Sequence, residues 1–198
     1  MTPAAGLQAE HPRKPADLSA WIALLATPGV GRETARRLLR QAGSAEAVLR
    51  AAPAVIEDWL HGAHPQARAV SRALGSAART HAALIERTAA WLAGSPRRAA
   101  CTLGDPLYPG ALLQMADPPL VLYLEGRIEL LGQVSVAIVG SRRATAQGLE
   151  NARMFAAGLS QAGITVVSGL ALGIDAAAHE GALPGAGRTV AVVGTGLD

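Results

Sequence analysis

The sequence predicts an α/β protein: a partial Rossmann-like parallel sheet with helices on both faces, preceded by a small all-helical domain. Three short apolar runs support the sheet, and each ends in a turn of small residues. Helix-length segments separate the runs, which is typical of βαβ units with a buried parallel sheet. The runs are residues 134–139, 165–167 and 189–193, and the turns are Gly140-Ser141-Arg142, Ser168-Gly169-Leu170 and Gly194-Thr195-Gly196.

The composition is that of a folded protein with unevenly distributed charge. The chain has 198 residues, and 50% of them are hydrophobic, so it can bury a core. Residues 1–98 contain 13 Lys/Arg and 7 Asp/Glu, whereas residues 99–198 contain 5 and 8. The basic half permits contact with nucleic acid, and a coding bias toward Arg explains it equally well.

The single cysteine and the short apolar runs bear on the protein's location. Cys101 alone cannot form a disulfide framework, so a reducing compartment is the default. No segment approaches the roughly 20 apolar residues that span a bilayer. We therefore expect a cytoplasmic protein without a membrane partner.

In the first half of the chain, the sequence predicts a disordered tail over residues 1–16 and a helical domain over residues 17–95. Two of its helices are joined by Pro28-Gly29-Val30-Gly31 and resemble the helix-hairpin-helix of DNA-binding proteins. In that motif, backbone N–H groups at a helix N-terminus meet a phosphate, so Gly29, Gly31 and Arg32 are candidate DNA contacts. A packing module with solvated arginines is an equally supported alternative.

Local signals predict the boundaries of three helices in this domain. Gly43 is expected to end the second helix of the hairpin, because glycine readily adopts the left-handed conformation that closes a helix. Ser44 is expected to cap a short helix that reaches Arg50. Pro53 suits the first position of another helix, which ends near Leu60.

Two longer segments complete this half. Residues 65–92 have a helical pattern throughout. The proline-rich connector, residues 96–133, contains two strand-like runs, 99–103 and 120–124, and is expected to extend or brace the sheet that follows. The incomplete Rossmann-like domain then covers residues 134–198.

The turn after the first run of that domain is a candidate anion site. It contains Gly140, Ser141, Arg142, Arg143 and Thr145. Amide N–H groups and the dipole at a helix N-terminus favour negative charge, and an arginine can bind phosphate through two hydrogen bonds.

The helix that follows this turn is predicted to run to Ala162 and to stop at Gly163. Its apolar residues recur at helical spacing and predict one buried face. That face consists of Ala152, Phe155, Ala156 and Leu159.

The second turn combines Ser168, Gly169, Gly173, Asp175 and His179. Its glycines allow close backbone approach, Asp175 is placed to cap the next helix, and His179 lies one turn further along the same face. A Ser-His-Asp hydrolase triad is excluded, because the nucleophile elbow needs a glycine two residues before the serine, where a valine stands. We expect Asp175 and His179 to fix the loop rather than to catalyse.

Motifs for other chemistries are missing. Gly140-Ser-Arg142 replaces the Gly-x-Gly of dinucleotide sites, and there is no Walker loop. His179 has no second histidine at metalloprotease spacing. We expect no cofactor, no metal and no NAD- or ATP-dependent chemistry.

Three long motifs together resemble a known family. They are Ala137-Ile-Val-Gly-Ser-Arg142, Ser168-Gly-Leu-Ala-x-Gly-Ile-Asp175 and Thr189-Val-Ala-Val-Val-Gly-Thr-Gly-Leu-Asp198. With Tyr108-Pro109 and Asp117-Pro118-Pro119 upstream, they are similar to the DprA (Smf) family of DNA-processing proteins. The resemblance covers residues 18–198 and implies that the helical domain is of the sterile-alpha-motif (SAM-like) type.

The resemblance implies a non-enzymatic, cytoplasmic dimer that binds single-stranded DNA on an extended Rossmann fold. It also implies that the protein loads RecA during natural transformation. Gly140, Ser141 and Arg142 match the family's basic DNA pocket, with Arg142 as the expected phosphate ligand. The pocket wall is implied to be Ser168, Gly169 and Gly173, with Asp175, His179, Gly194 and Gly196 as structural or pocket residues.

Two features qualify this expectation. Family members continue past the last motif, so we expect this chain to be part of a longer protein, with most dimer and RecA surfaces outside it. None of the six aromatic residues lies in the three strand-end turns, so base stacking is expected to be weak.

Two other functions remain open on the sequence alone. One is a nucleotide-processing Rossmann enzyme of the phosphoribohydrolase type, whose Pro-Gly-Gly-x-Gly-Thr loop this sequence lacks. The other is a structural adaptor that uses the helical domain for protein contacts.

Overall fold

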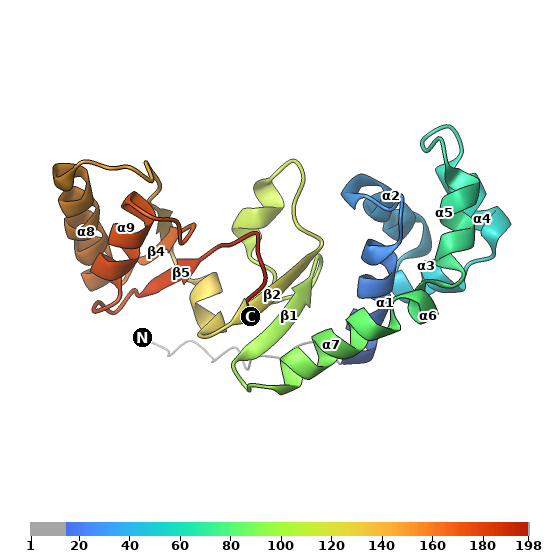
Figure 1. The fold of residues 1–198 in the computed structure, drawn as a ribbon, viewed down its shortest axis with the longest axis horizontal. Helices are drawn as coiled ribbons and strands as arrows, with labels where there is room; N and C mark the ends of the chain where they lie inside the picture. The colour runs from blue at the N-terminus through green and yellow to red at the C-terminus, as the bar shows by residue number, and fades with distance from the viewer. Residues whose placement is uncertain (1–14, 198) are drawn as a thin grey trace, which may run out of the picture. The chain divides into compact units, whose positions relative to one another are not determined.

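The computed structural model describes residues 15–197 and contains two compact units, Met1–Leu124 and Glu125–Asp198 (Figure 1). The tail expected over residues 1–16 lies outside the described residues except for Pro15 and Ala16, which begin the first helix. Over the described part of the chain, every helix is too short or too polar to cross a membrane.

The first unit contains a bundle of seven helices among the described residues, packed around one apolar core. Its largest fully buried side chains include Leu24, Leu38, Val48, Ile56 and Leu60. The helices are α1 (Pro15–Ala26), α2 (Arg32–Ala42), α3 (Ala45–Arg50), α4 (Pro53–Leu60), α5 (Ala67–Leu74), α6 (Ala77–Thr80) and α7 (Ala82–Ala93).

The predicted helix boundaries in this bundle are confirmed. Gly43 closes α2 with φ 82°, and its N–H donates to the Leu39 carbonyl at 2.8 Å. The Ser44 hydroxyl accepts from the Ala47 N–H at 3.1 Å, and α4 begins at Pro53. The helical pattern of residues 65–92 is divided among α5, α6 and α7, and the first break falls at Gly75, a poor helix former.

The connector forms a sheet of its own. Strands β1 (Arg98–Thr102) and β2 (Val121–Glu125) pair with each other, and the 3₁₀ helix η1 (Gly110–Gln114) lies between them in the chain. Leu120 is buried in the core of the helical bundle. In the described part of the chain this two-stranded sheet is separate from the parallel sheet, so an extension of the parallel sheet is not observed.

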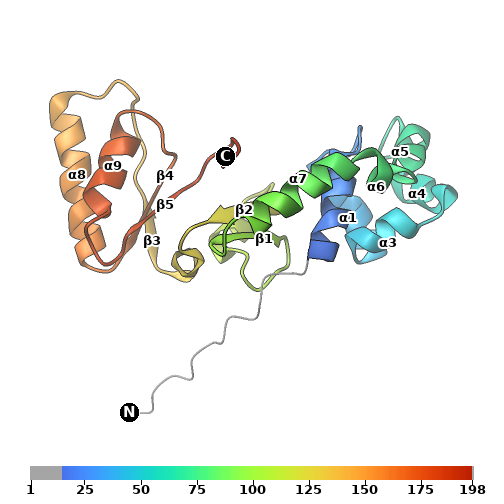
Figure 2. The ribbon, with the colours of Figure 1, turned by 60° about the horizontal axis from the view of Figure 1, so that its bottom comes forward.

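The second unit has the predicted β-α-β-α-β order. Its three strands form a parallel sheet in the order β3-β4-β5, with Val136 opposite Val166 and Val167 opposite Val190 (Figure 2). Its elements are η2 (Ile128–Gly132), β3 (Ser135–Ala137), α8 (Ala146–Gln161), β4 (Thr165–Ser168), α9 (Ile174–Ala182) and β5 (Thr189–Ala191).

Both helices of this unit lie on the same face of the sheet (Figures 1 and 2). One buried cluster joins Ala156 of α8, Val166 of β4 and Ala178 of α9. In the described residues, helices therefore cover one face of the sheet, whereas the sequence predicted helices on both faces. Right-handed crossovers between strands that are added in one direction place their helices on one side. Just beyond the ends of β3 and β5, Val139 and Val192 are 72% and 59% exposed.

Helices α8 and α9 approach closely because small residues face each other. A Cβ atom on Gly181 would lie 2.3 Å from the Arg153 carbonyl oxygen. The face of α8 that is buried consists of Ala152, Ala156 and Ser160. The placement of Phe155 on that face is wrong: the ring is 68% exposed, because helices this close leave no room for it.

Replacing Gly181 by alanine should therefore destabilise the second unit. The added methyl group would overlap the α8 backbone, and we expect a loss of about 2 kcal/mol in the free energy of unfolding, measured by urea denaturation. Gly158→Ala is the matched control, because a Cβ there meets nothing within 4 Å. That control should gain about 0.5–1 kcal/mol from helix propensity, and equal losses in both variants would contradict the close approach.

Candidate nucleic-acid interface

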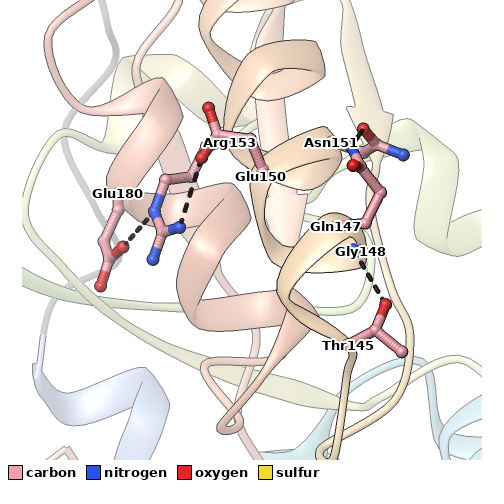
Figure 3. Close-up of polar contacts among 7 residues, drawn as sticks. All are labelled: Thr145, Gln147, Gly148, Glu150, Asn151, Arg153 and Glu180. Atoms are coloured by element: carbon pink, nitrogen blue, oxygen red, sulfur yellow. Dashed lines mark hydrogen bonds and ion pairs between the residues drawn. The ribbon is translucent and has the colours of Figure 1, made fainter.

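The turn between β3 and α8 is shaped by its own hydroxyl groups. The Thr145 hydroxyl caps α8 by accepting from the Gly148 N–H at 3.1 Å (Figure 3). The Ser141 hydroxyl accepts from the Arg143 N–H at 3.0 Å. These bonds hold the turn in a fixed shape while both arginine side chains remain exposed to solvent.

The loop between β4 and α9 packs directly on this turn. Gly173 has φ 79°, and a Cβ atom there would lie 2.3 Å from the Ser141 carbonyl oxygen and 2.9 Å from the Arg142 Cα. The Ile174 N–H donates to the same Ser141 carbonyl at 3.2 Å. A Cβ atom on Gly140 would in turn lie 2.8 Å from Ile174 Cγ1. The structure thus brings the two predicted turns together through glycine contacts.

The side chains of Ser168, predicted at the pocket wall, and of Asp175, predicted as a structural or pocket residue, form hydrogen bonds inside the protein. The Ser168 hydroxyl is buried and donates to the Ile138 carbonyl at 2.6 Å, which joins β4 to β3. The Asp175 carboxylate accepts from the Gly169 N–H at 3.1 Å. Asp175 is not the cap of α9, since Gly173 occupies the N-cap position. Both side chains therefore support the loop from within.

His179 is a second internal support. Its Nδ1 lies 2.7 Å from the Thr189 hydroxyl, which itself donates to the Val166 carbonyl at 2.7 Å. Because the hydroxyl proton is used there, we assign the imidazole proton to Nδ1. Nε2 is buried without a hydrogen-bond partner in the described part of the chain. Burial lowers the pKa of His179, and the nearby Asp175 charge opposes that shift only in part.

Arg142 and Arg143 differ from the other arginines of the second unit. Arg127 pairs with Glu129 at 2.9 Å, and Arg153 pairs with Glu180 at 2.8 Å (Figure 3). The Arg188 guanidinium donates to the Leu183 carbonyl at 2.6 Å. Within residues 125–197, the guanidinium groups of Arg142 and Arg143 have no such partner. Their charge is available to an anion from solution.

The third strand end contributes less defined geometry. The Val192 N–H donates to the Ser168 carbonyl at 2.9 Å, so the backbone after β5 continues along β4. Gly194 and Gly196 are exposed beyond it. A Cβ atom on Gly194 would meet nothing within 4 Å, and no close approach of the kind seen at Gly173 occurs there.

The hairpin of the first unit has an internal partner that the sequence did not reveal. Asp117 forms ion pairs with Arg32, at 2.7 Å, and with Arg36. Gly29 has φ 84°, and its carbonyl lies 3.0 Å from His64 Nε2. The basic stripe of α2 is therefore partly neutralised by the connector, and only the position of Asp117 beside two prolines hinted at a fixed carboxylate.

Comparison with known families accounts for both units. Residues 99–198 match the model of DNA recombination-mediator protein A, and residues 15–74 match that of the DprA-like N-terminal helix-hairpin-helix domain. The first match covers half of the chain. The chain belongs to the DNA recombination-mediator protein A (DprA/Smf) family. The resemblance stated from the motifs is thereby confirmed, as is the helix-hairpin-helix nature of the first domain.

Individual relatives are similar over part of their length. The DNA processing protein DprA of Streptococcus pneumoniae is 45% identical over 94 residues, which are 48% of this chain and 33% of the relative. Protein Smf of Synechocystis is 48% identical over 101 residues, or 49% and 25% of the two chains. Protein Smf of Escherichia coli is 38% identical over 114 residues, or 58% and 30%. The matched region spans about a quarter to a third of these relatives.

The fold is also similar to a solved member of the family. The crystal structure of DNA processing protein A from Streptococcus pneumoniae matches with a TM-score of 0.68 and 27% sequence identity. The match covers 90% of this chain and 58% of that structure. This agreement supports the order of a helical unit followed by a parallel α/β unit.

The buried His179 should make the stability of the second unit fall as the pH falls. Its pKa in the folded state is lower than in the unfolded state, so below about pH 6.5 the unfolded chain binds more protons and the free energy of unfolding decreases. His179→Asn keeps a donor near Thr189 and removes the titration, so its unfolding free energy should depend less on pH between about 5 and 7.

The matched control is His61→Asn, at an exposed loop position. Denaturant unfolding across this pH range should show the wild-type dependence in the His61 variant. Parallel pH profiles for wild type and His179→Asn would show that His179 is not the group responsible.

Proposed function

We propose that this chain binds single-stranded DNA at the joined turns after β3 and β4, by contacting phosphates with Arg142 and Arg143. One observation carries the proposal: the other three arginines of the second unit are committed to internal partners, whereas these two are free of them in the described residues. Their turn precedes the N-terminus of α8, where the helix dipole favours an anion. The family's description as a recombination mediator supports DNA as the anion.

The geometry suits a contact that is independent of sequence. Phosphates are recognised by charge and by backbone or guanidinium donors, whereas bases are distinguished by hydrogen bonds to their edges. The side chains of Ser168 and Asp175 are used inside the protein and are not available for such readout. We therefore propose that Gly140, Ser141, Thr145, Gly169 and Gly173 position the site through their backbone or caps.

Further properties of the whole protein follow from the family resemblance and belong to the same proposal. We expect a longer form of this chain to act as a homodimer that protects single-stranded DNA and delivers it to RecA. A binding role without catalysis is part of the proposal. Release of free base from a nucleoside monophosphate would favour the phosphoribohydrolase alternative instead.

Arg142→Ala should weaken binding of a fluorescein-labelled oligothymidine, measured by fluorescence anisotropy. Loss of one phosphate contact should lower the slope of log Kd against log salt by about 0.7. The affinity at low salt should fall at least about tenfold, because a hydrogen bond to a charged group contributes about 1.5–3 kcal/mol.

Arg127→Ala is the control for this measurement. It removes the same charge from the same unit, but at an exposed arginine that pairs with Glu129. Equal losses of affinity in both variants would indicate a response to net charge alone. Unchanged binding by Arg142→Ala would disprove the proposed site.

The hairpin is a second proposed contact, weaker than the first because Asp117 neutralises Arg32 and Arg36. Arg32→Ala should lower the oligothymidine affinity less than about threefold at low salt. Asp117→Asn should raise it, because two guanidinium groups lose their internal partner. An unchanged affinity in Asp117→Asn, with wild-type thermal stability, would assign the hairpin to packing alone.

A further inference from the structure

The loop between β4 and α9 presents two leucines to solvent beside the candidate anion site. Leu170 is 62% exposed, and Leu172 is 77% exposed. The residue after Leu172 is Gly173, which lies against the backbone of Ser141 and Arg142. Burying their aliphatic surface against a ligand would be favourable, so their position beside two arginines without internal partners suits a ligand that is both anionic and apolar.

The backbone of this loop is unusual at Leu170. Its φ is 58°, in the left-handed region that bulky side chains rarely adopt. Hydrogen bonds fix the loop before Leu170 and between the two leucines. The Gly169 N–H donates to Asp175, and the Ala176 N–H donates to the Ala171 carbonyl at 3.1 Å. A strained residue that is held in a rigid loop is a sign of a functional constraint.

We propose that Leu170 and Leu172 pack against nucleobases and thereby select single-stranded over double-stranded DNA, an inference that rests on the proposed phosphate site. The faces of bases are apolar and accessible in a single strand, whereas in a duplex they are stacked inside. Aromatic side chains usually make this contact. In the described part of the second unit the one Phe, Tyr or Trp residue is Phe155, which lies in the middle of α8 rather than in the loop.

The chemistry of the loop fits this division of labour. Arg142 and Arg143 attract phosphates of either form of DNA, because both forms carry them. The leucines add an apolar contribution to the binding free energy. This contribution is independent of salt and requires unstacked bases. Removing the leucines should therefore reduce the preference for single-stranded over double-stranded DNA. Removing Arg142 should weaken the binding of both forms.

The test is the double variant Leu170→Gly with Leu172→Ala, compared with wild type by anisotropy. The three ligands are a normal single strand, an abasic single strand of the same length and a duplex. We expect about tenfold weaker binding of the normal strand and changes below about twofold for the other two. The salt slope should remain at the wild-type value, since no phosphate contact is lost.

Two controls separate this role from a structural one. Leu183→Ala removes a leucine of similar exposure, 55%, at the other end of α9, and should leave all three affinities unchanged. Leu170→Gly alone should not lower the melting temperature, because glycine adopts a positive φ without strain.

The outcomes distinguish this inference from the proposed function. Equal losses on normal and abasic strands, or no loss on either, would overturn the role of the leucines while leaving the phosphate site intact. Failure of the wild-type protein to bind any of the three ligands would instead overturn the proposed function itself.

Discussion

The contact on which the site depends is the one between Gly173 and the backbone of Ser141 and Arg142. A methyl group on Gly173 would lie only 2.3 Å from a carbonyl oxygen, so no other residue type fits without moving one of the turns. Ile174 then fills the space above Gly140, where a side chain would also collide. The ends of two neighbouring strands thus become one rigid surface, and the arginines are held in place by backbone rather than by side-chain partners.

The elements that the sequence predicted well are those that local chemistry decides. Gly43, Ser44 and Pro53 act within one helical turn, and their helix ends are found where expected. The predicted burial of Phe155 and the predicted helices on both faces of the sheet were wrong, because both features depend on contacts with residues distant in the chain. The spacing of Phe155 suits a buried face, yet the approach of α9 at Gly181 admits only small side chains.

For the proposed site, the sequence predicted which turns lie together but not how their side chains are used. Glycine, serine and arginine at strand ends indicate an anion site, and this indication does not depend on which hydrogen-bond partner each side chain has. Whether Ser168 faces a ligand or the Ile138 carbonyl depends on the register of β3 and β4, which sequence alone does not provide. Thr189 was missed as the partner of His179, although a buried imidazole N–H needs an acceptor and a hydroxyl in the strand that follows its helix could have been considered for that role.

Two arginines at the surface of a unit with more acidic than basic residues would make only a modest anion site. Residues 125–198 contain five arginines, and three of them form ion pairs or a hydrogen bond within the protein. Electrostatic attraction of this kind is screened by salt and does not distinguish a single strand from a duplex. In the function proposed for this chain, discrimination therefore has to come from a part of the ligand that only one form exposes. The rigid loop that carries Leu170 and Leu172 supplies such a surface at the place where the arginines would hold the phosphates.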